Sequence, residues 1–252
     1  MAPSFPLYLP SDFRRAFASD TSLRRIAKTA HWGADSKILD LSGGATCLFL
    51  AKELGCSVIV ADTDTAAASA LNQRIAAKSL GDRITVKVLP SWEKLPFAEG
   101  EFDGVIAVGR VMMPLEKAAS TYRPLLAPKG RLVLSYPARI GRVSDKQSLA
   151  FWEQQLGEPL ALPRQCLGVI ERNGYEPELT EALSDSELDD YYREIESSLS
   201  RLPAEAQTAA SPLKSELALF RELTPRAGYT LALFGVRRKE PGEPPPPSRH
   251  GG

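Results

Sequence analysis

Short apolar runs recur through the first half of the chain, and stretches with helical periodicity separate them. Each run is rich in Val, Ile or Leu and does not alternate strictly between apolar and polar positions. This pattern is typical of strands in a parallel sheet that is covered on both faces. We therefore predict strands at 37–41, 57–61, 84–89, 104–108 and 131–136.

The stretches between the strands predict helices with recognisable ends. The predicted helices 46–54 and 65–80 are each followed by a glycine, Gly55 and Gly81, and glycine just past the last apolar turn is a helix stop. Asp64 is placed to cap the second of them. Because strands and helices alternate, the connections should be right-handed crossovers in a doubly wound α/β sheet.

The pattern changes after the fifth strand. A shorter helix is predicted after Pro114, ending before a turn at 128–130. The sequence that follows the fifth strand has mainly helical character. A charged stretch rich in Leu and Ala, with breaks near Pro203 and Pro212, indicates a helical insertion before the last strand. The later elements are helices around 149–156 and 164–173, a strand at 175–183, the insertion at 184–225 and a last strand at 228–238.

These elements predict one domain over residues 1–240, with an N-terminal cap at 1–34. The Pro-rich tail 241–252 should be disordered. Lys plus Arg and Asp plus Glu both number 31, so no net field favours nucleic acid or an anionic membrane. The three cysteines are widely spaced, and no leader or membrane span is evident. We expect a cytoplasmic monomer or homodimer without a metal site.

Parallel sheets of this kind bind ligands outside the carboxyl ends of their strands, near the point where the strand order reverses. This rule selects the loop after each predicted strand as a candidate site. The five loops are 42–46, 62–63, 91–92, 109–113 and 136–139.

Four ordered segments in these loops resemble the class I S-adenosylmethionine (SAM)-dependent methyltransferases of the UbiE-like, small-molecule type. The segments are ILDLSGGAT, VIVAD, LPSWEKLPFAEGEFDGVIAV and LLAPKGRLVLSYP, within residues 35–137. GYEPEL and GYTLALFGVRRK resemble the closing hairpin of that family more weakly. The resemblance implies a Rossmann-like, mostly parallel seven-stranded sheet with an antiparallel last strand, and methyl transfer to a small-molecule acceptor.

The resemblance also implies which residues hold SAM. The backbone of Ser42, Gly43 and Gly44 should pass the methionine part, and Asp40 should organise the turn or reach the amino group through water. Asp62 should accept both ribose hydroxyls, with Thr63 beside it. The remaining positions are Ser91 and Trp92 at the adenine, with Trp92 equally well explained as a packing residue, and Gly109 near the sulfonium or ribose.

The chain departs from the family pattern in its glycine turn. Ser42 and Thr46 stand where glycine is common, so a turn that needs positive φ there would be strained. A degenerate methyltransferase-like protein, acting as a non-catalytic binding or partner protein, is therefore an alternative. A nicotinamide-dependent dehydrogenase would need glycines at Ser42 and Cys47 and is disfavoured.

The catalytic residues are less defined than the cofactor residues. Arg110 and Arg139 follow the fourth and fifth strands and are candidate anchors for an anionic group. If the acceptor is a hydroxyl, a base is required, and Tyr136 or a carboxylate in the insertion are the candidates. A lid should come from residues 8–17 and 184–223, where Tyr191 and Tyr192 either close over the pocket or belong to a surface helix.

Overall fold

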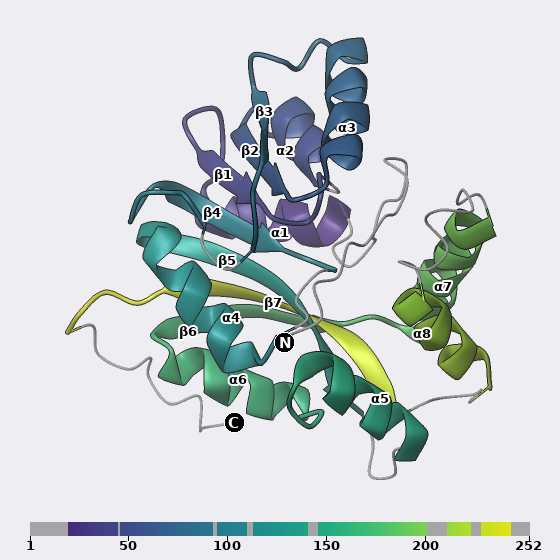
Figure 1. Cartoon of the computed structure of the whole chain (residues 1–252). Coiled ribbons are helices and arrows are strands. Elements are labelled where there is room, and N and C mark those ends of the chain that lie inside the picture. The colour runs from purple at the N-terminus through teal and green to yellow at the C-terminus, as the bar shows by residue number, and fades with distance from the viewer. Residues whose placement is uncertain are drawn as a thin grey trace.

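The computed structural model describes residues 20–44, 46–92, 95–109, 113–140, 146–200, 211–222 and 228–242. Its centre is a seven-stranded sheet of order β3-β2-β1-β4-β5-β7-β6 (Figure 1). The strands are β1 (Lys37–Asp40), β2 (Ser57–Asp62), β3 (Ile84–Val88), β4 (Phe102–Ala107), β5 (Leu126–Arg139), β6 (Tyr175–Ala182) and β7 (Tyr229–Arg238).

The pairing of the strands confirms the predicted fold class. The strands β3, β2, β1, β4 and β5 are parallel to one another. The last strand, β7, lies antiparallel between β5 and β6. The strand order reverses between β1 and β4, so the loops that follow these two strands meet at the switch point.

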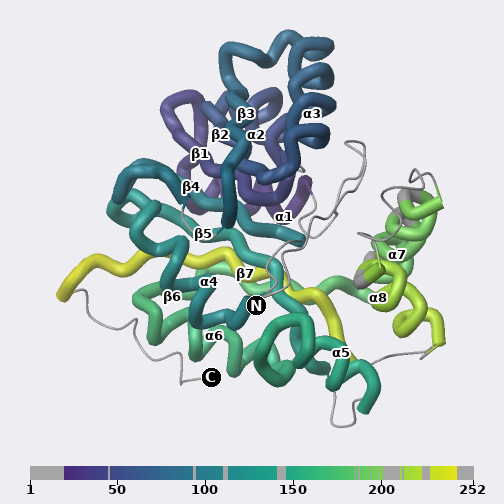
Figure 2. The backbone as a smooth tube through the Cα atoms, in the orientation of Figure 1, coloured from purple at the N-terminus to yellow at the C-terminus, as the bar shows by residue number. Residues whose placement is uncertain are grey.

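Eight helices flank the sheet in the described part of the chain. Figures 1 and 2 show α4 and α6 together beside β5–β7–β6, whereas α7 and α8 form a pair to one side of the sheet. The helices are α1 (Asp20–Ala30), α2 (Cys47–Glu53), α3 (Thr65–Ala77), α4 (Leu115–Tyr122), α5 (Lys146–Leu156), α6 (Pro163–Arg172), α7 (Asp185–Ser200) and α8 (Ser211–Glu222). None of these helices is long and apolar enough to cross a membrane.

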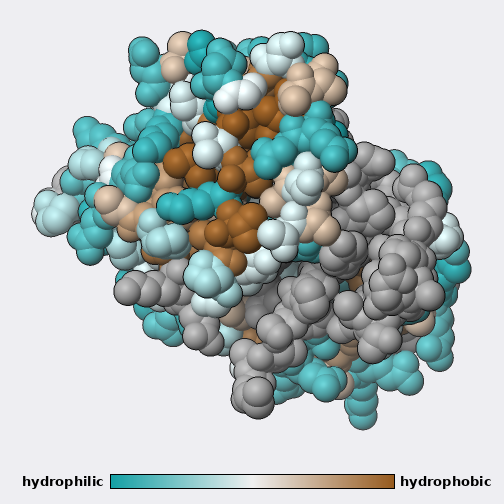
Figure 3. Space-filling model, turned by 45° about the horizontal axis from the view of Figure 1, so that its top comes forward, coloured by the Kyte–Doolittle hydropathy of each residue, from teal (hydrophilic) through white to brown (hydrophobic). Residues whose placement is uncertain are grey.

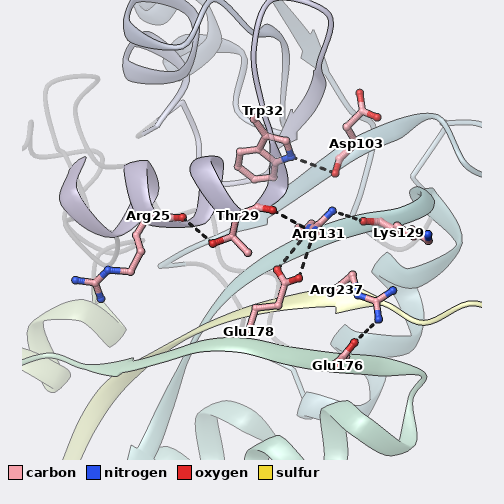
Figure 4. A network of polar contacts seen from close by, with 9 residues as sticks. All are labelled: Arg25, Thr29, Trp32, Asp103, Lys129, Arg131, Glu176, Glu178 and Arg237. Carbon is pink, nitrogen blue, oxygen red and sulfur yellow. Dashed lines mark hydrogen bonds and ion pairs between the residues drawn. The ribbon is translucent and has the colours of Figure 1, made fainter. Parts of the chain in front are cut away.

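The first helix, α1, was not among the predicted elements, which gave only a cap at 1–34. Its buried residues Leu23, Ile26 and Ala27 have helical spacing and pack on the sheet. Figure 4 shows how polar contacts hold its C-terminal end: Arg131 of β5 donates to the Thr29 carbonyl and to Glu178 of β6. The cationic side chain also complements the helix dipole at that end.

Two predicted boundaries are wrong. The second predicted helix was expected to stop at Gly81, but α3 ends at Ala77 and Ser79 takes the positive φ of 53°. The expected turn at 128–130 lies inside β5, where the pairing with β4 shifts register and Lys129 has a φ of 58°. In both places a non-glycine residue adopts the left-handed conformation, which sequence rules assign to glycine.

The predicted helix cap at Asp64 and the predicted helix break near Pro212 agree with the structure. Asp64 caps α3, because its side chain accepts hydrogen bonds from the backbone of Ala66 and Ala67. Pro212 is the second residue of α8, as expected of a break at that point. Pro203, the lid segment 8–17 and most of the tail 241–252 lie outside the described residues.

One face of the molecule carries a group of apolar side chains bordered by hydrophilic ones (Figure 3). Among the described residues, Val88 on the edge strand β3 is a large apolar residue with 45% exposure. The interior strands are covered on both faces: Ile38 and Leu39 of β1 and Val105 and Ile106 of β4 have no exposed surface. The side chains at the strand ends are therefore carried by a rigid core.

Candidate cofactor and acceptor site

Asp40 organises the turn that follows β1. Its carboxylate is fully buried and accepts hydrogen bonds from the Ser42 backbone at 2.7 Å, the Thr46 backbone at 3.2 Å and the Thr46 hydroxyl at 2.7 Å. Burial raises the pKa of the Asp40 carboxyl above its usual value, although these hydrogen bonds lower it in part. The acid therefore faces inward and fixes residues 40–46, called the glycine turn below.

The glycine turn uses positive φ only where the sequence has glycine, among the residues described there. Gly43 and Gly44 have φ values of 66° and 81°, whereas Thr46 has an ordinary φ of −108° and Ser42 is not among the left-handed residues. A Cβ on Gly44 would also lie 2.4 Å from a methyl group of Leu71. The departures from the family pattern at Ser42 and Thr46 consequently cause no backbone strain.

The serine at position 42 has a structural function of its own. Its hydroxyl accepts a hydrogen bond from the Val108 backbone at 3.1 Å and donates to the Ile106 carbonyl at 3.4 Å. Both partners lie at the end of β4, so the side chain joins the two loops at the switch point. A glycine at this position would lack both bonds.

Asp62 ends the adjacent strand β2. Asp40 of β1 pairs with Val60 of β2, so Asp62 lies two residues beyond the partner of Asp40. One Asp62 oxygen accepts hydrogen bonds from the Thr63 and Asp64 backbones, at 2.7 and 3.2 Å. These bonds orient the carboxylate at the edge of the sheet where the parallel strands end.

The loops after β3 and β4 complete this edge. Ser91 and Trp92 follow β3, whose Val88 pairs with Asp62, and Trp92 is partly buried against the core. Gly109 has a φ of 77° and donates its backbone N–H to the Ser135 hydroxyl of β5 at 2.7 Å. Topology therefore brings the predicted cofactor residues to one edge of the sheet.

Tyr136 is held in the structure as a hydrogen-bond donor. It is 2% exposed, and its hydroxyl donates to Glu158 at 2.6 Å, with the Met113 carbonyl at 3.0 Å as a second acceptor within reach of the same proton. Glu158 also accepts the Leu115 backbone N–H at 2.8 Å, so it caps α4 from a distant segment. Burial and the Glu158 carboxylate raise the pKa of the phenol, so Tyr136 keeps its proton and is not available to accept one.

Of the two candidate arginines, the structure describes one. Arg139 ends β5, where its backbone donates to the Ala161 carbonyl at 2.8 Å and its side chain is half-buried. Arg110 lies outside the described residues. Tyr191 and Tyr192 are buried in α7, with 3% and 2% exposure, whereas Asp190 and Arg193 are exposed, so the two tyrosines lie on the inner face of an amphipathic helix.

The sequence analysis missed three residues that support the candidate site. Thr46 donates hydrogen bonds to Asp40, Ser135 accepts one from Gly109, and Glu158 caps α4. Thr46 could have been found from its position at the N-cap of a helix. Ser135 and Glu158 act over 26 and 43 residues of sequence, and no local pattern marks such pairs.

The cysteines and acids offer no second centre in the part of the chain that the structure describes. Burial raises the pKa of Cys47, that of Cys56 to about 11 and that of Cys166 to about 12, so all three thiols are neutral. No group of three or more His, Cys, Asp or Glu side chains is placed there to hold a metal ion.

Comparisons with known proteins support the fold. No family model matches the chain. An uncharacterized protein of Haemophilus influenzae is 34% identical over 121 residues, which are 46% of this chain and 47% of that protein, so the match spans about half the length of the relative.

Among solved structures, a SAM-dependent methyltransferase of Thiobacillus denitrificans in complex with S-adenosyl-L-homocysteine (SAH) superposes with a TM-score of 0.70 at 15% identity, over 91% of this chain and 96% of that one. The geranyl diphosphate C-methyltransferase of Streptomyces coelicolor gives 0.58 at 16% identity over 86% and 81%. The cyclase SpnF gives 0.65 at 15% identity over 92% and 86%. This chain has the fold of the class I SAM-dependent methyltransferases.

Proposed function

We propose that this protein transfers a methyl group from SAM to a small-molecule acceptor by in-line displacement. The observation that carries the proposal is the pair of buried acids at the ends of adjacent strands. Asp40 turns inward to hold the glycine turn, and Asp62 is oriented at the neighbouring strand end. A rigid turn beside an acid suits a ligand that has an amino-acid part and a ribose.

The described residues fit SAM by their chemistry. The backbone of Ser42, Gly43 and Gly44 would lie along the methionine part, and Asp62 with Thr63 would hold the ribose hydroxyls. Ser91 and Trp92 would border the adenine, and Gly109 would lie near the sulfonium. When bound, SAM supplies an activated methyl group on a positively charged sulfur.

The contribution of the chain to such a reaction is positional. Methyl transfer neutralises the sulfonium, so the protein has mainly to align the acceptor with the methyl carbon and exclude water. An amine or thiolate acceptor needs little help from a base. We assign Tyr136 a structural function, because its proton is engaged with Glu158 and its pKa is raised.

A degenerate, non-catalytic protein is the second candidate, and the glycine turn weighs against it. Its main support was the loss of glycine at positions 42 and 46, yet neither position adopts positive φ. The likeness to SpnF remains relevant, because a protein named as a cyclase shares this fold. Fold alone does not decide the reaction.

Calorimetric titration tests the proposal directly. We expect SAM and SAH to bind with micromolar affinity and NAD not to bind. Binding of SAM and SAH would justify a screen of methyl acceptors. Absence of binding by both would refute the cofactor assignment and favour the non-catalytic candidate.

A substitution at Asp62 tests the placement of the ribose. Asp62→Ala should weaken SAH binding by about 1.5 to 3 kcal/mol, the cost of losing hydrogen bonds to a charged group. Asp103→Ala is a matched control, since Asp103 also accepts a backbone N–H, from Lys37 at 2.8 Å, but at the opposite end of the sheet. Equal SAH affinities for the two variants would show that the ribose lies elsewhere.

A further inference from the structure

Two strands continue beyond the edge where the cofactor is proposed to bind. The last residue of β4, Ala107, pairs with Leu134, but β5 runs on to Arg139 and stays paired with β7 as far as Tyr229. We call residues 135–139 with 229–233 the β5–β7 extension. Figures 1 and 2 show that it leads towards α5 and the α7–α8 pair.

The side chain of Arg139, in the β5–β7 extension, has a buried nitrogen atom, Nε, without a hydrogen-bond partner among the described residues. No ion pair to its guanidinium occurs within the part of the chain that the structure describes. The other arginines on this face of the strands are paired. Arg131 binds Glu178 and Arg237 binds Glu176 (Figure 4). A buried Nε without an acceptor among the described residues is costly, and an anionic ligand would supply the missing acceptor.

Aromatic side chains border Arg139. Tyr229 is its direct cross-strand partner, and such partners present their side chains on the same face of a sheet. The Tyr229 ring meets the ring of Trp152 from α5 edge to face, with centroids 5.3 Å apart. Trp152 is 2% exposed, and its indole N–H is directed at the Tyr229 hydroxyl. The two rings therefore form one aromatic wall on the Tyr229 side of the extension.

A buried acid lies on the other side of Tyr229. The Tyr192 hydroxyl donates to Glu216 at 2.9 Å and lies 2.5 Å from the Tyr229 hydroxyl. Because the single proton of Tyr192 is directed to Glu216, Tyr229 must donate to Tyr192. The chain of hydroxyls ends on a carboxylate that is 4% exposed. Glu216 is thus separated from Arg139 by two phenols and does not neutralise it.

We propose that Arg139, Trp152 and Tyr229 form a subsite for a carboxylate of the methyl acceptor. The inference rests on the proposed function and names its substrate class: a small molecule that has one anionic end and an apolar body. Arg offers two parallel N–H donors to a carboxylate, and the aromatic rings supply the apolar wall. The Glu216 carboxylate at the end of the hydroxyl chain repels any anion on this side of the sheet, and it disfavours a phosphate dianion more than a singly charged carboxylate.

Simple aromatic probes test the subsite without a known acceptor. Benzoate, phenyl phosphate and the neutral isostere benzamide are titrated calorimetrically into the SAH-saturated protein. We expect benzoate to bind at least about tenfold more tightly than benzamide. We expect phenyl phosphate to bind more weakly than benzoate. Equal affinities for benzoate and benzamide, or no benzoate binding, overturn the subsite, and tighter binding of phenyl phosphate overturns the choice of carboxylate.

Variants of two arginines separate a specific subsite from general charge. Arg139→Gln should lose at least about tenfold in benzoate affinity, and Arg139→Lys should keep part of it because the charge remains. Arg238→Gln is the matched control: Arg238 also has a buried Nε without a partner, but it donates to the Leu126 carbonyl at the far end of the sheet. A loss of benzoate affinity in Arg238→Gln equal to that in Arg139→Gln contradicts the proposal.

SAH binding distinguishes the failure of this inference from the failure of the proposed function. Arg139→Gln should bind SAH as the natural protein does, which also shows that the variant is folded. If benzoate binds through Arg139 but SAH does not bind, the subsite stands and the methyl-transfer proposal falls. If SAH binds and benzoate does not, the acceptor class is wrong and the cofactor assignment stands.

Discussion

The hydrogen bonds of the glycine turn and those beside the β5–β7 extension differ in how far apart the two bonded residues lie in the sequence. Asp40 is held by Ser42 and Thr46, within six residues. Beside the extension, Tyr192 of α7 meets Glu216 of α8 and Tyr229 of β7 across 24 and 37 residues. The bonds that hold Asp40 are thus local, whereas the bonds of the hydroxyl chain beside the proposed acceptor subsite are tertiary contacts.

The largest effect that sharpens this comparison is expected at Gly44. Gly44→Ala should destabilise the protein by about 2 to 4 kcal/mol, because positive φ is strained for alanine and its Cβ would clash with Leu71. Gly100→Ala is the matched control, with a φ of 68° and open space around its Cβ, and should cost about 1 to 2 kcal/mol. Urea unfolding of both variants measures the difference. Equal losses would show that Leu71 moves aside and that the turn is not rigid.

The same contrast explains what the sequence could predict. The strands β1 to β4 and the acids at the ends of β1 and β2 follow from hydrophobic pattern and local motifs, and the resemblance covers this part. The helix α1 was missed although Leu23, Ile26 and Ala27 have helical spacing. The partners of Tyr136 and Tyr192 could not be predicted, because side-chain hydrogen bonds between segments far apart in the chain leave no periodic signal in the sequence.

Thr46 tests whether the turn depends on a single local bond. Thr46→Val should cost about 1.5 to 3 kcal/mol of unfolding free energy, because it removes a hydroxyl donor to the buried Asp40. Thr46→Ser should restore most of the loss, since it keeps the hydroxyl. Thr29→Val is the control, because its hydroxyl binds an exposed backbone carbonyl. A Thr46→Val protein as stable as the control would mean that the backbone N–H groups suffice for Asp40.

Two tyrosines test the corresponding network in the acceptor half. Tyr192→Phe should cost about 1.5 to 3 kcal/mol, because it leaves the buried Glu216 without its phenol donor. Tyr229→Phe should cost only about 0.5 to 1.5 kcal/mol, since Tyr192 still donates to Glu216. Thermal and urea unfolding compare the two. A reversed order would show that the proton of Tyr192 points to Tyr229. Unchanged SAH affinity in both variants would confirm that the two halves are energetically separate.

The smallest expected effect is a dependence of stability on pH that belongs to Asp40. In the unfolded chain this carboxyl loses its proton near its usual pKa of 3.8, whereas the folded protein keeps the proton to a higher pH because burial disfavours the charge. The folded state therefore binds more protons in that window, so this group stabilises the protein below pH 3.8 and its contribution is lost as the pH rises through the folded pKa.

Asp40→Asn removes this titration. The quantity to follow is the unfolding free energy of the natural protein minus that of the variant. This difference should fall as the pH rises above 3.8, with a slope of at most about 1.4 kcal/mol per pH unit for one proton. Taking the difference between the two proteins cancels the other carboxyls, including Glu101, whose pKa is lowered by its bond to Lys37 and which acts in the opposite direction. A difference that rises with pH would mean that the donors of the glycine turn outweigh burial, and that the turn is organised around a fully charged Asp40.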